Sequence, residues 1–126
     1  MGYVKSFREL EVYKLARVVS KDIFILSKEF PKEERYSLTD QIRRSSRSVG
    51  AQIAEAWAKR RYEMHFISKL PDADAEQLET QHWIEVSEES HYIDSETRDL
   101  LLFKCESVGK MIYSMIDKSS IFCQKS

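Results

Sequence analysis

Apolar residues recur at intervals of three or four positions along most of this chain, and this spacing limits the fold more than any other feature. The repeat matches the period of an α-helix, because every third or fourth side chain returns to the same face. The first stripe consists of Val12, Leu15, Val19, Ile23, Leu26 and Phe30. It predicts a helix over about residues 6–30, which ends before Pro31 because the residue preceding a proline avoids the helical conformation.

Three further stripes predict three more long helices. They cover about residues 37–61, 62–90 and 95–118, and residues 119–126 are left as a polar tail. Pro71 falls inside the third stretch, where a proline removes one hydrogen bond and clashes with the preceding turn. We therefore expect the third stretch to form a single helix that is kinked near Pro71.

The length and the turn-forming residues agree with a helical domain. The chain has 126 residues, the length of one domain, and only three Gly and two Pro. An all-β fold would need more of these two residue types for its tight turns. Long helices joined by short loops form a bundle in which neighbouring helices alternate in direction. The prediction is an all-α protein, an antiparallel up-down-up-down four-helix bundle that spans residues 1–126 as a single domain.

The second predicted helix carries an unusual number of small side chains. Four of them, Gly50, Ala51, Ala54 and Ala58, lie on a flank beside its apolar stripe. Small side chains let a second backbone approach closely. We infer that this helix is buried on two sides, with these four residues as the candidate oligomer interface.

The charges are distributed unevenly along the chain, although the total is only −1. Residues 31–62 hold eight basic and four acidic side chains, whereas residues 63–98 hold two basic and ten acidic ones. A basic segment with this density can neutralise phosphates and so bind nucleic acid without choosing a sequence. The candidate nucleic-acid-binding residues are Arg43, Arg44, Arg47, Lys59, Arg60 and Arg61.

The positions of three arginines allow two interpretations. If the second helix continues to residue 61, Arg43, Arg47 and Arg61 point within about 40° of one direction over roughly 27 Å, so they could follow a phosphate backbone. The alternative is a structural scaffold, in which these arginines pair with acidic residues of the third helix at subunit interfaces. The candidate partners are Glu76, Glu79, Glu85 and Glu88.

The sequence indicates no catalytic or metal site and no cofactor. Glu79-x-x-His82 and Glu88-x-x-His91 each place a carboxylate and an imidazole on one helix face. A di-iron bundle needs such motifs on two different helices, but here both fall on the same one. Cys105 lies on the apolar stripe of the fourth helix, which favours a buried side chain over a nucleophile.

Four aromatic residues are expected near one another around the second and third helices. They are Trp57, Tyr62, Phe66 and Trp83. Aromatic side chains at helical spacing are usually core or interface residues, although stacked nucleic-acid bases are an alternative use.

The cellular location follows from what the chain lacks. The first ten residues contain Lys5 and Arg8, but no apolar segment follows them as in a secretion signal. No run of 18 apolar residues could span a membrane. With two cysteines, which we expect to be free thiols, the prediction is a cytoplasmic protein without a membrane partner.

The run from Arg43 to Trp57, RRSSRSVGAQIAEAW, carries a family resemblance. The pattern continues through Tyr62, Phe66 and Trp83, and Phe7-Arg8-Glu9-Leu10 matches the opening of the same family. The chain resembles the bacterial four-helix bundle proteins first noticed as reading frames within intervening sequences of large-subunit ribosomal RNA genes. It is also similar to the accessory protein of diversity-generating retroelements.

The resemblance implies an up-down bundle that assembles into a ring-like homopentamer. For the retroelement relative it further implies nucleic-acid binding through a basic surface and contact with a reverse transcriptase. The expected partners are therefore further copies of the chain, RNA or DNA, and a reverse transcriptase or another nucleoprotein. We expect a non-enzymatic binding module that uses the basic residues of its second helix.

Overall fold

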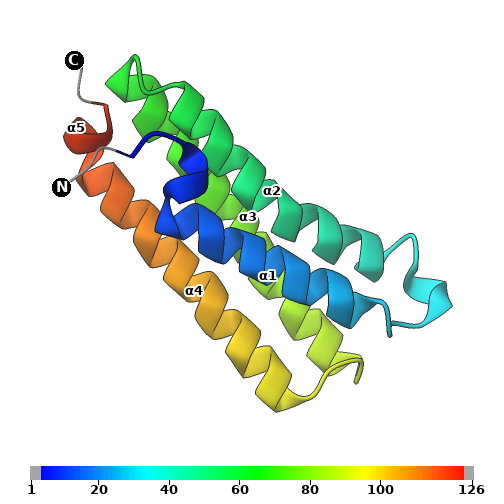
Figure 1. The fold of residues 1–126 in the computed structure, drawn as a ribbon. Helices are drawn as coiled ribbons and strands as arrows, with labels where there is room; N and C mark the ends of the chain where they lie inside the picture. The colour runs from blue at the N-terminus through cyan, green and yellow to red at the C-terminus, as the bar shows by residue number, and fades with distance from the viewer. Residues whose placement is uncertain (1–3, 124–126) are drawn as a thin grey trace.

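The computed structural model describes residues 4–123, and four long helices account for most of them. These are α1 (Glu11–Ser27), α2 (Leu38–Ala58), α3 (Glu63–Glu89) and α4 (Ser95–Asp117), and a short α5 (Ser119–Phe122) follows them (Figure 1). Two 3₁₀ turns, η1 (Phe7–Glu9) and η2 (Lys32–Glu34), precede α1 and α2. The described residues contain no strand, so the predicted all-α class is confirmed.

Consecutive helices pack side by side and run in opposite directions (Figure 1). Between α2 and α3, Ser45 Oγ lies 2.9 Å from Thr80 Oγ1, and Glu55 Oε1 lies 3.3 Å from Lys69 Nζ. A later residue of α2 thus meets an earlier residue of α3, as antiparallel packing requires. The four helices form a bundle around a shared interior.

The interior consists of two apolar clusters with a polar layer between them. One cluster is centred on Ile53, Phe66 and Ile112, and the other on Ile23 and Ile84. The layer between them consists of Ser45, Ser46, Gln77 and Thr80, all buried. The side chains of this layer are hydrogen-bonded, which keeps the cost of burying them low.

The first helix is shorter than predicted at both ends. Residues 6–10 were expected to be helical, but Leu10 is extended (φ −67°, ψ 131°) and places its side chain in the core, so α1 begins at Glu11. At the other end, the backbone N–H groups of Lys28, Glu29 and Phe30 bond three residues back, a tighter winding that leads into Pro31.

The third helix continues through Pro71 without a break. The proline leaves the carbonyl of Ile67 without its usual N–H partner, but Pro71 is exposed, so water can reach this side of the helix. On the opposite side, Leu70 and Ala73 are fully buried. Packing of these side chains holds the two halves together despite the missing hydrogen bond.

The predicted polar tail, residues 119–126, has more structure than expected at its start. Residues 119–122 form α5, and the side chain of Phe122 stacks against Phe66 with 6.2 Å between ring centroids. Residues 124–126 lie outside the described part of the chain. The C-terminal segment therefore closes one end of the bundle.

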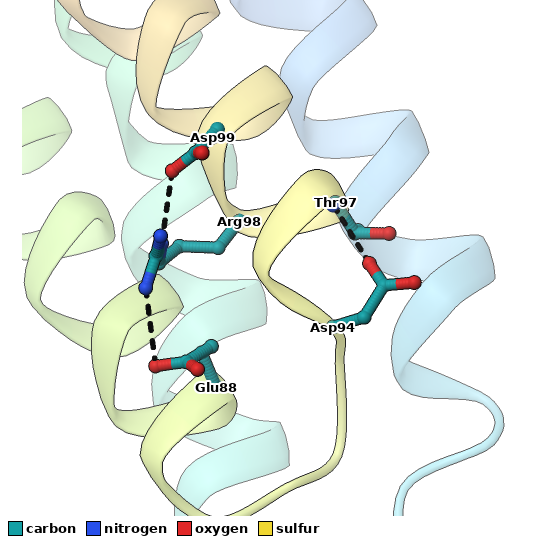
Figure 2. Close-up of polar contacts among 5 residues, drawn as sticks. All are labelled: Glu88, Asp94, Thr97, Arg98 and Asp99. Atoms are coloured by element: carbon teal, nitrogen blue, oxygen red, sulfur yellow. Dashed lines mark hydrogen bonds and ion pairs between the residues drawn. The ribbon is translucent and has the colours of Figure 1, made fainter.

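The corner between α3 and α4 is fixed by two sets of polar contacts (Figure 2). Asp94 caps α4, because its Oδ1 accepts a hydrogen bond of 2.8 Å from the backbone N–H of Thr97. Arg98 lies between Glu88 of α3 (3.4 Å) and its own neighbour Asp99 (3.0 Å). Glu88 is thus already paired within the chain.

Candidate nucleic-acid interface

Two arginines of α2 surround an aromatic ring of α1. Arg43 and Arg47 are one turn apart, and their guanidinium carbons lie 4.8 and 5.3 Å from the centroid of Phe24. Lys28 Nζ lies 4.8 Å from the same centroid. Arg43 Nε also donates a hydrogen bond of 2.7 Å to Ser27 Oγ. Three cations, two on α2 and one directly after α1, are thus held around one ring by cation–π attraction.

A fourth cation lies further along α1, where α1 and α2 pack together. Arg17 donates a hydrogen bond of 2.7 Å to the hydroxyl of Tyr13, and its side chain lies beside Gly50. A Cβ at Gly50 would lie 3.4 Å from the Tyr13 ring and 3.9 Å from Arg17 Cδ. We use the name α1–α2 basic face for this surface, which consists of Lys28, Arg43 and Arg47 around Phe24, and of Arg17 beside Tyr13.

No carboxylate within the described residues forms an ion pair with this face. The cations that form ion pairs within the described residues all lie outside this face; they are Lys14, Lys69, Arg98 and Lys104. The positive charge of the face is therefore not neutralised within residues 4–123, and it can attract an external anion.

Within the described residues, none of the four glutamates proposed as partners forms an ion pair with Arg43, Arg47 or Arg61. Glu88 pairs with Arg98, and Glu79 accepts a hydrogen bond from Trp83 Nε1. Within the described part of one chain, the expected pairing of arginines with the third helix does not occur, because Arg43 and Arg47 face α1 instead. Pairing between subunits stays a prediction.

The six predicted basic residues do not form one surface. Helix α2 ends at Ala58, so the projection of Arg61 onto the same line as Arg43 and Arg47 was wrong. Lys59, Arg60 and Arg61 lie in the loop that leads to α3, at the far end of α2 from Arg43. Arg44 is exposed on α2.

Arg60 has a structural role in this loop. Its guanidinium carbon lies 3.4 Å from the centroid of the Trp57 ring, and its Nε donates a hydrogen bond of 2.8 Å to the Trp57 carbonyl. Burial lowers the pKa of Arg60 from its ordinary value. Because Arg60 is partly buried, it is a weaker candidate for phosphate binding than Lys59 and Arg61, which are both exposed.

The four small residues proposed for an oligomer interface do not share one environment. Gly50 is buried against Tyr13 of its own chain, because the backbones of α1 and α2 approach there. Ala54 is half-buried, and Ala51 and Ala58 are exposed. Gly50 therefore serves packing within the chain, and the interface prediction is carried by the three alanines.

The remaining sequence candidates are placed as follows. The described residues contain no group of three or more His, Cys, Asp or Glu side chains that could hold a metal ion. Cys105 is buried, as predicted, and its burial raises the pKa of the thiol to about 12.

Trp57 and Phe66 belong to one core cluster but Trp83 packs on the other, so the expected aromatic cluster is not a single group. No described helix is long and apolar enough to cross a membrane.

The contribution of α1 to the basic face was not predicted from the sequence. Phe24, Lys28 and Arg17 belong to a segment whose net charge gave no signal. They could have been found by aligning the predicted first and second helices antiparallel about Pro31, which places Phe24 and Lys28 opposite the start of the second helix. The ring could not be linked to specific cations without coordinates.

The fold and this surface define a class: a small helical bundle with an unneutralised basic face. The family model of the 23S rRNA-intervening sequence proteins matches residues 8–114. The chain therefore belongs to the 23S rRNA-intervening sequence protein family, as the resemblance in its sequence predicted.

A solved structure supports the same assignment. It is a 1.70 Å crystal structure of a protein with unknown function from the S23 ribosomal protein family of Bacteroides thetaiotaomicron VPI-5482. The two chains are 29% identical with a TM-score of 0.75, and the similarity covers 84% of this chain and 95% of that one. No curated protein matches the chain.

Proposed function

We propose that this protein is a non-enzymatic module that binds nucleic acid, alone or within a nucleoprotein, through the α1–α2 basic face. The observation that carries the proposal is the set of three cations around Phe24, none of them in an ion pair within the described residues. Charge of this kind binds phosphates by releasing the counterions condensed on the nucleic acid.

The ring of Phe24 explains why these side chains suit the task. Free arginine and lysine side chains lose rotamer entropy when they bind, at a cost of about 1–2 kcal/mol each. Contacts with Phe24 and the bond from Arg43 to Ser27 hold part of that geometry in advance. Backbone phosphates carry no sequence information, so the face is expected to bind without sequence preference.

A salt titration of binding tests the proposal. With four cations on the face, the slope of log K against log salt for a duplex should be about −3 to −4, because each neutralised phosphate contributes about −0.9. Arg43→Gln with Arg47→Gln should lower the affinity and reduce the steepness by about 2. Lys110→Gln with Lys118→Gln removes the same charge from exposed positions on and just after α4 and serves as the control. Binding without salt dependence, or equal effects of the two pairs, would contradict the proposal.

A second candidate function is a homo-oligomeric scaffold whose arginines close subunit interfaces. It is favoured by large apolar side chains that are exposed in the single chain, including Ile25, Leu100 and Phe103. Charge reversal at Arg43 and Arg47 to Glu separates the candidates by light scattering. A binding face predicts an unchanged mass with lost nucleic-acid retention, whereas an arginine-closed interface predicts a smaller mass.

A further inference from the structure

The loop between α2 and α3 forms a second surface, distinct from the α1–α2 basic face. Tyr62 and Met64 are 56% and 74% exposed there. They border a hollow of about 440 Å³, within the size range of ligand sites. The residues that line it are Arg61, Tyr62, Glu63, Met64, His65 and Cys123.

Two aromatic rings lie side by side in this hollow. The centroids of Tyr62 and His65 are 5.4 Å apart, with 57° between the ring planes. Because the rings are tilted, they do not stack face to face on each other. The guanidinium carbon of Arg61 lies 5.8 Å from the Tyr62 centroid, so a cation stands beside the aromatic surface.

The charge of this corner is positive and available. Lys59 and Arg61 are exposed, and neither forms an ion pair within residues 4–123. The one carboxylate lining the hollow, that of Glu63, accepts a hydrogen bond of 2.6 Å from Ser119 Oγ. Arg60 is packed on Trp57 and steadies the loop that carries these groups.

We propose that this corner binds a nucleotide unit of a single strand, with the base against Tyr62 and His65 and its phosphate at Arg61 and Lys59. The inference rests on the proposed function and refines it. A planar ring joined to an anion is what an aromatic surface beside a cation recognises, and a paired duplex hides the faces of its bases. The α1–α2 basic face holds the backbone of any nucleic acid, whereas the corner selects unpaired strands.

Fluorescence anisotropy with a labelled single strand and the matching duplex tests this division. Tyr62→Ala with His65→Ala should weaken single-strand binding about 10-fold or more, given the usual contribution of base stacking, and leave duplex binding within about 2-fold. Tyr62→Phe keeps an aromatic face and should retain single-strand binding. Both altered side chains are exposed, and an unchanged urea midpoint verifies that the variants fold.

The outcomes separate the two proposals. If the Tyr62→Ala with His65→Ala variant loses affinity equally for the single strand and the duplex, or for neither, the corner site is wrong. Salt-dependent binding of the duplex would still support the basic face. Absence of binding to any nucleic acid by the unaltered protein overturns both. Competition with AMP identifies the source of the nucleotide: if AMP alone binds as tightly as the strand, the corner is a free-nucleotide site and the single-strand proposal is wrong.

Discussion

A single residue with positive φ terminates α3. His91 has φ 64°, and it occupies the position after the helix cap that glycine usually takes. The N–H of Tyr92 bonds to the Ser87 carbonyl and that of His91 to the Glu88 carbonyl, both at 2.9 Å, which together form a Schellman motif. The left-handed conformation costs a non-glycine residue about 1–2 kcal/mol.

We therefore expect His91→Gly to stabilise the protein. The relief of strain exceeds the entropy that glycine adds to the unfolded chain, so the free energy of unfolding should rise by about 0.5–1 kcal/mol in urea denaturation. Ser90→Gly is the control, because Ser90 has φ −85° and gains nothing from glycine. A loss of stability in His91→Gly equal to that of the control would contradict the strain argument.

Just before α2, the carboxylate of Glu34 accepts hydrogen bonds from three groups. It accepts from Ser37 Oγ (2.6 Å), from the Tyr92 hydroxyl (2.8 Å) and from the N–H of Leu38 (3.3 Å). These bonds, that from Ser37 foremost, lower the pKa of the Glu34 carboxyl below its ordinary 4.5. The carboxylate form is therefore favoured in the folded state.

The stability that Glu34 contributes should depend on pH. Because its folded pKa is depressed, the contribution is present above about pH 4.5 and is lost as pH falls through the folded pKa. Glu34→Gln should lower the urea midpoint at pH 7, and the difference from the unaltered protein should shrink below pH 4.5. Glu33→Gln removes a charge from the same turn and controls for general electrostatics. A difference that stays constant down to pH 3 would refute this role.

Residue-level contacts of this kind were not predictable from the sequence. Glu34 and Tyr92 are 58 positions apart, and their hydrogen bond depends on the two loops meeting at one end of the bundle. Cys105 was predictable, because its burial follows from its place on an apolar stripe. A residue whose environment is set by its own helix can be predicted, whereas a residue paired across loops cannot.

At the scale of the helices, two glycines sit at helix–helix contacts with different amounts of space. In α4, a Cβ at Gly109 would lie 2.8 Å from Gln77 Nε2 and 3.2 Å from Asp74 Oδ1. Gln77 is only 4% exposed and is held by bonds to Asp74 and from Gln81, so it has no room to move. At Gly50 of α2, the nearest atom would be at 3.4 Å, an ordinary contact.

Substitution of these glycines should have opposite effects. Gly109→Ala should destabilise the protein by about 1–2 kcal/mol, because overpacking outweighs the better helix propensity of alanine. Gly50→Ala should be neutral or stabilise it by up to about 1 kcal/mol. Thermal and urea denaturation measure both changes, and the two variants control for each other. Similar values for the pair would show that local space does not decide the result.

The helices themselves were largely predictable, but their ends were not. The apolar stripes reflect burial on one face, and burial is what stabilises each helix. The start of α1 was misplaced because the packing of Leu10 overrides the helical preference of residues 6–10. The end of α2 at Ala58 was missed because no proline or glycine marks it, and that error misplaced Arg61.

At the scale of the whole molecule, the basic face depends on how α1 and α2 align. The sequence identified Arg43 and Arg47 as candidates, but their proximity to Phe24 and Lys28 is set by the axial register of two helices. Register is a property of the packed interior and has no local signal in the chain. The fold class was therefore predictable from periodicity, whereas the composition of the candidate site was only half predictable.

The polar layer between the two apolar clusters can specify a second register, that of α2 against α3. Ser45 and Thr80, both buried, meet only when α2 and α3 align as observed, and a shift of one turn would break the bond between them. Such pairs favour one arrangement over others at a small cost in stability. A double-mutant cycle measures this coupling directly.

The stability losses of two single substitutions in the layer should add up to more than the loss of the double variant. Thr80→Val and Ser45→Ala should each destabilise the protein by about 0.5–1.5 kcal/mol, because each removes the hydrogen bond between the two hydroxyls. The hydroxyl that remains keeps a bond within its own helix, to the carbonyl of Ile42 or of Glu76. The double variant should lose about 0.5–1.5 kcal/mol less than the sum, since the bond between the two hydroxyls can be lost only once. Ser87→Ala, a buried hydroxyl that bonds only within α3, should be additive with Thr80→Val and is the control. Strict additivity for Ser45 and Thr80 would mean that the layer does not select the register of α2 and α3, and that apolar packing alone aligns these two helices.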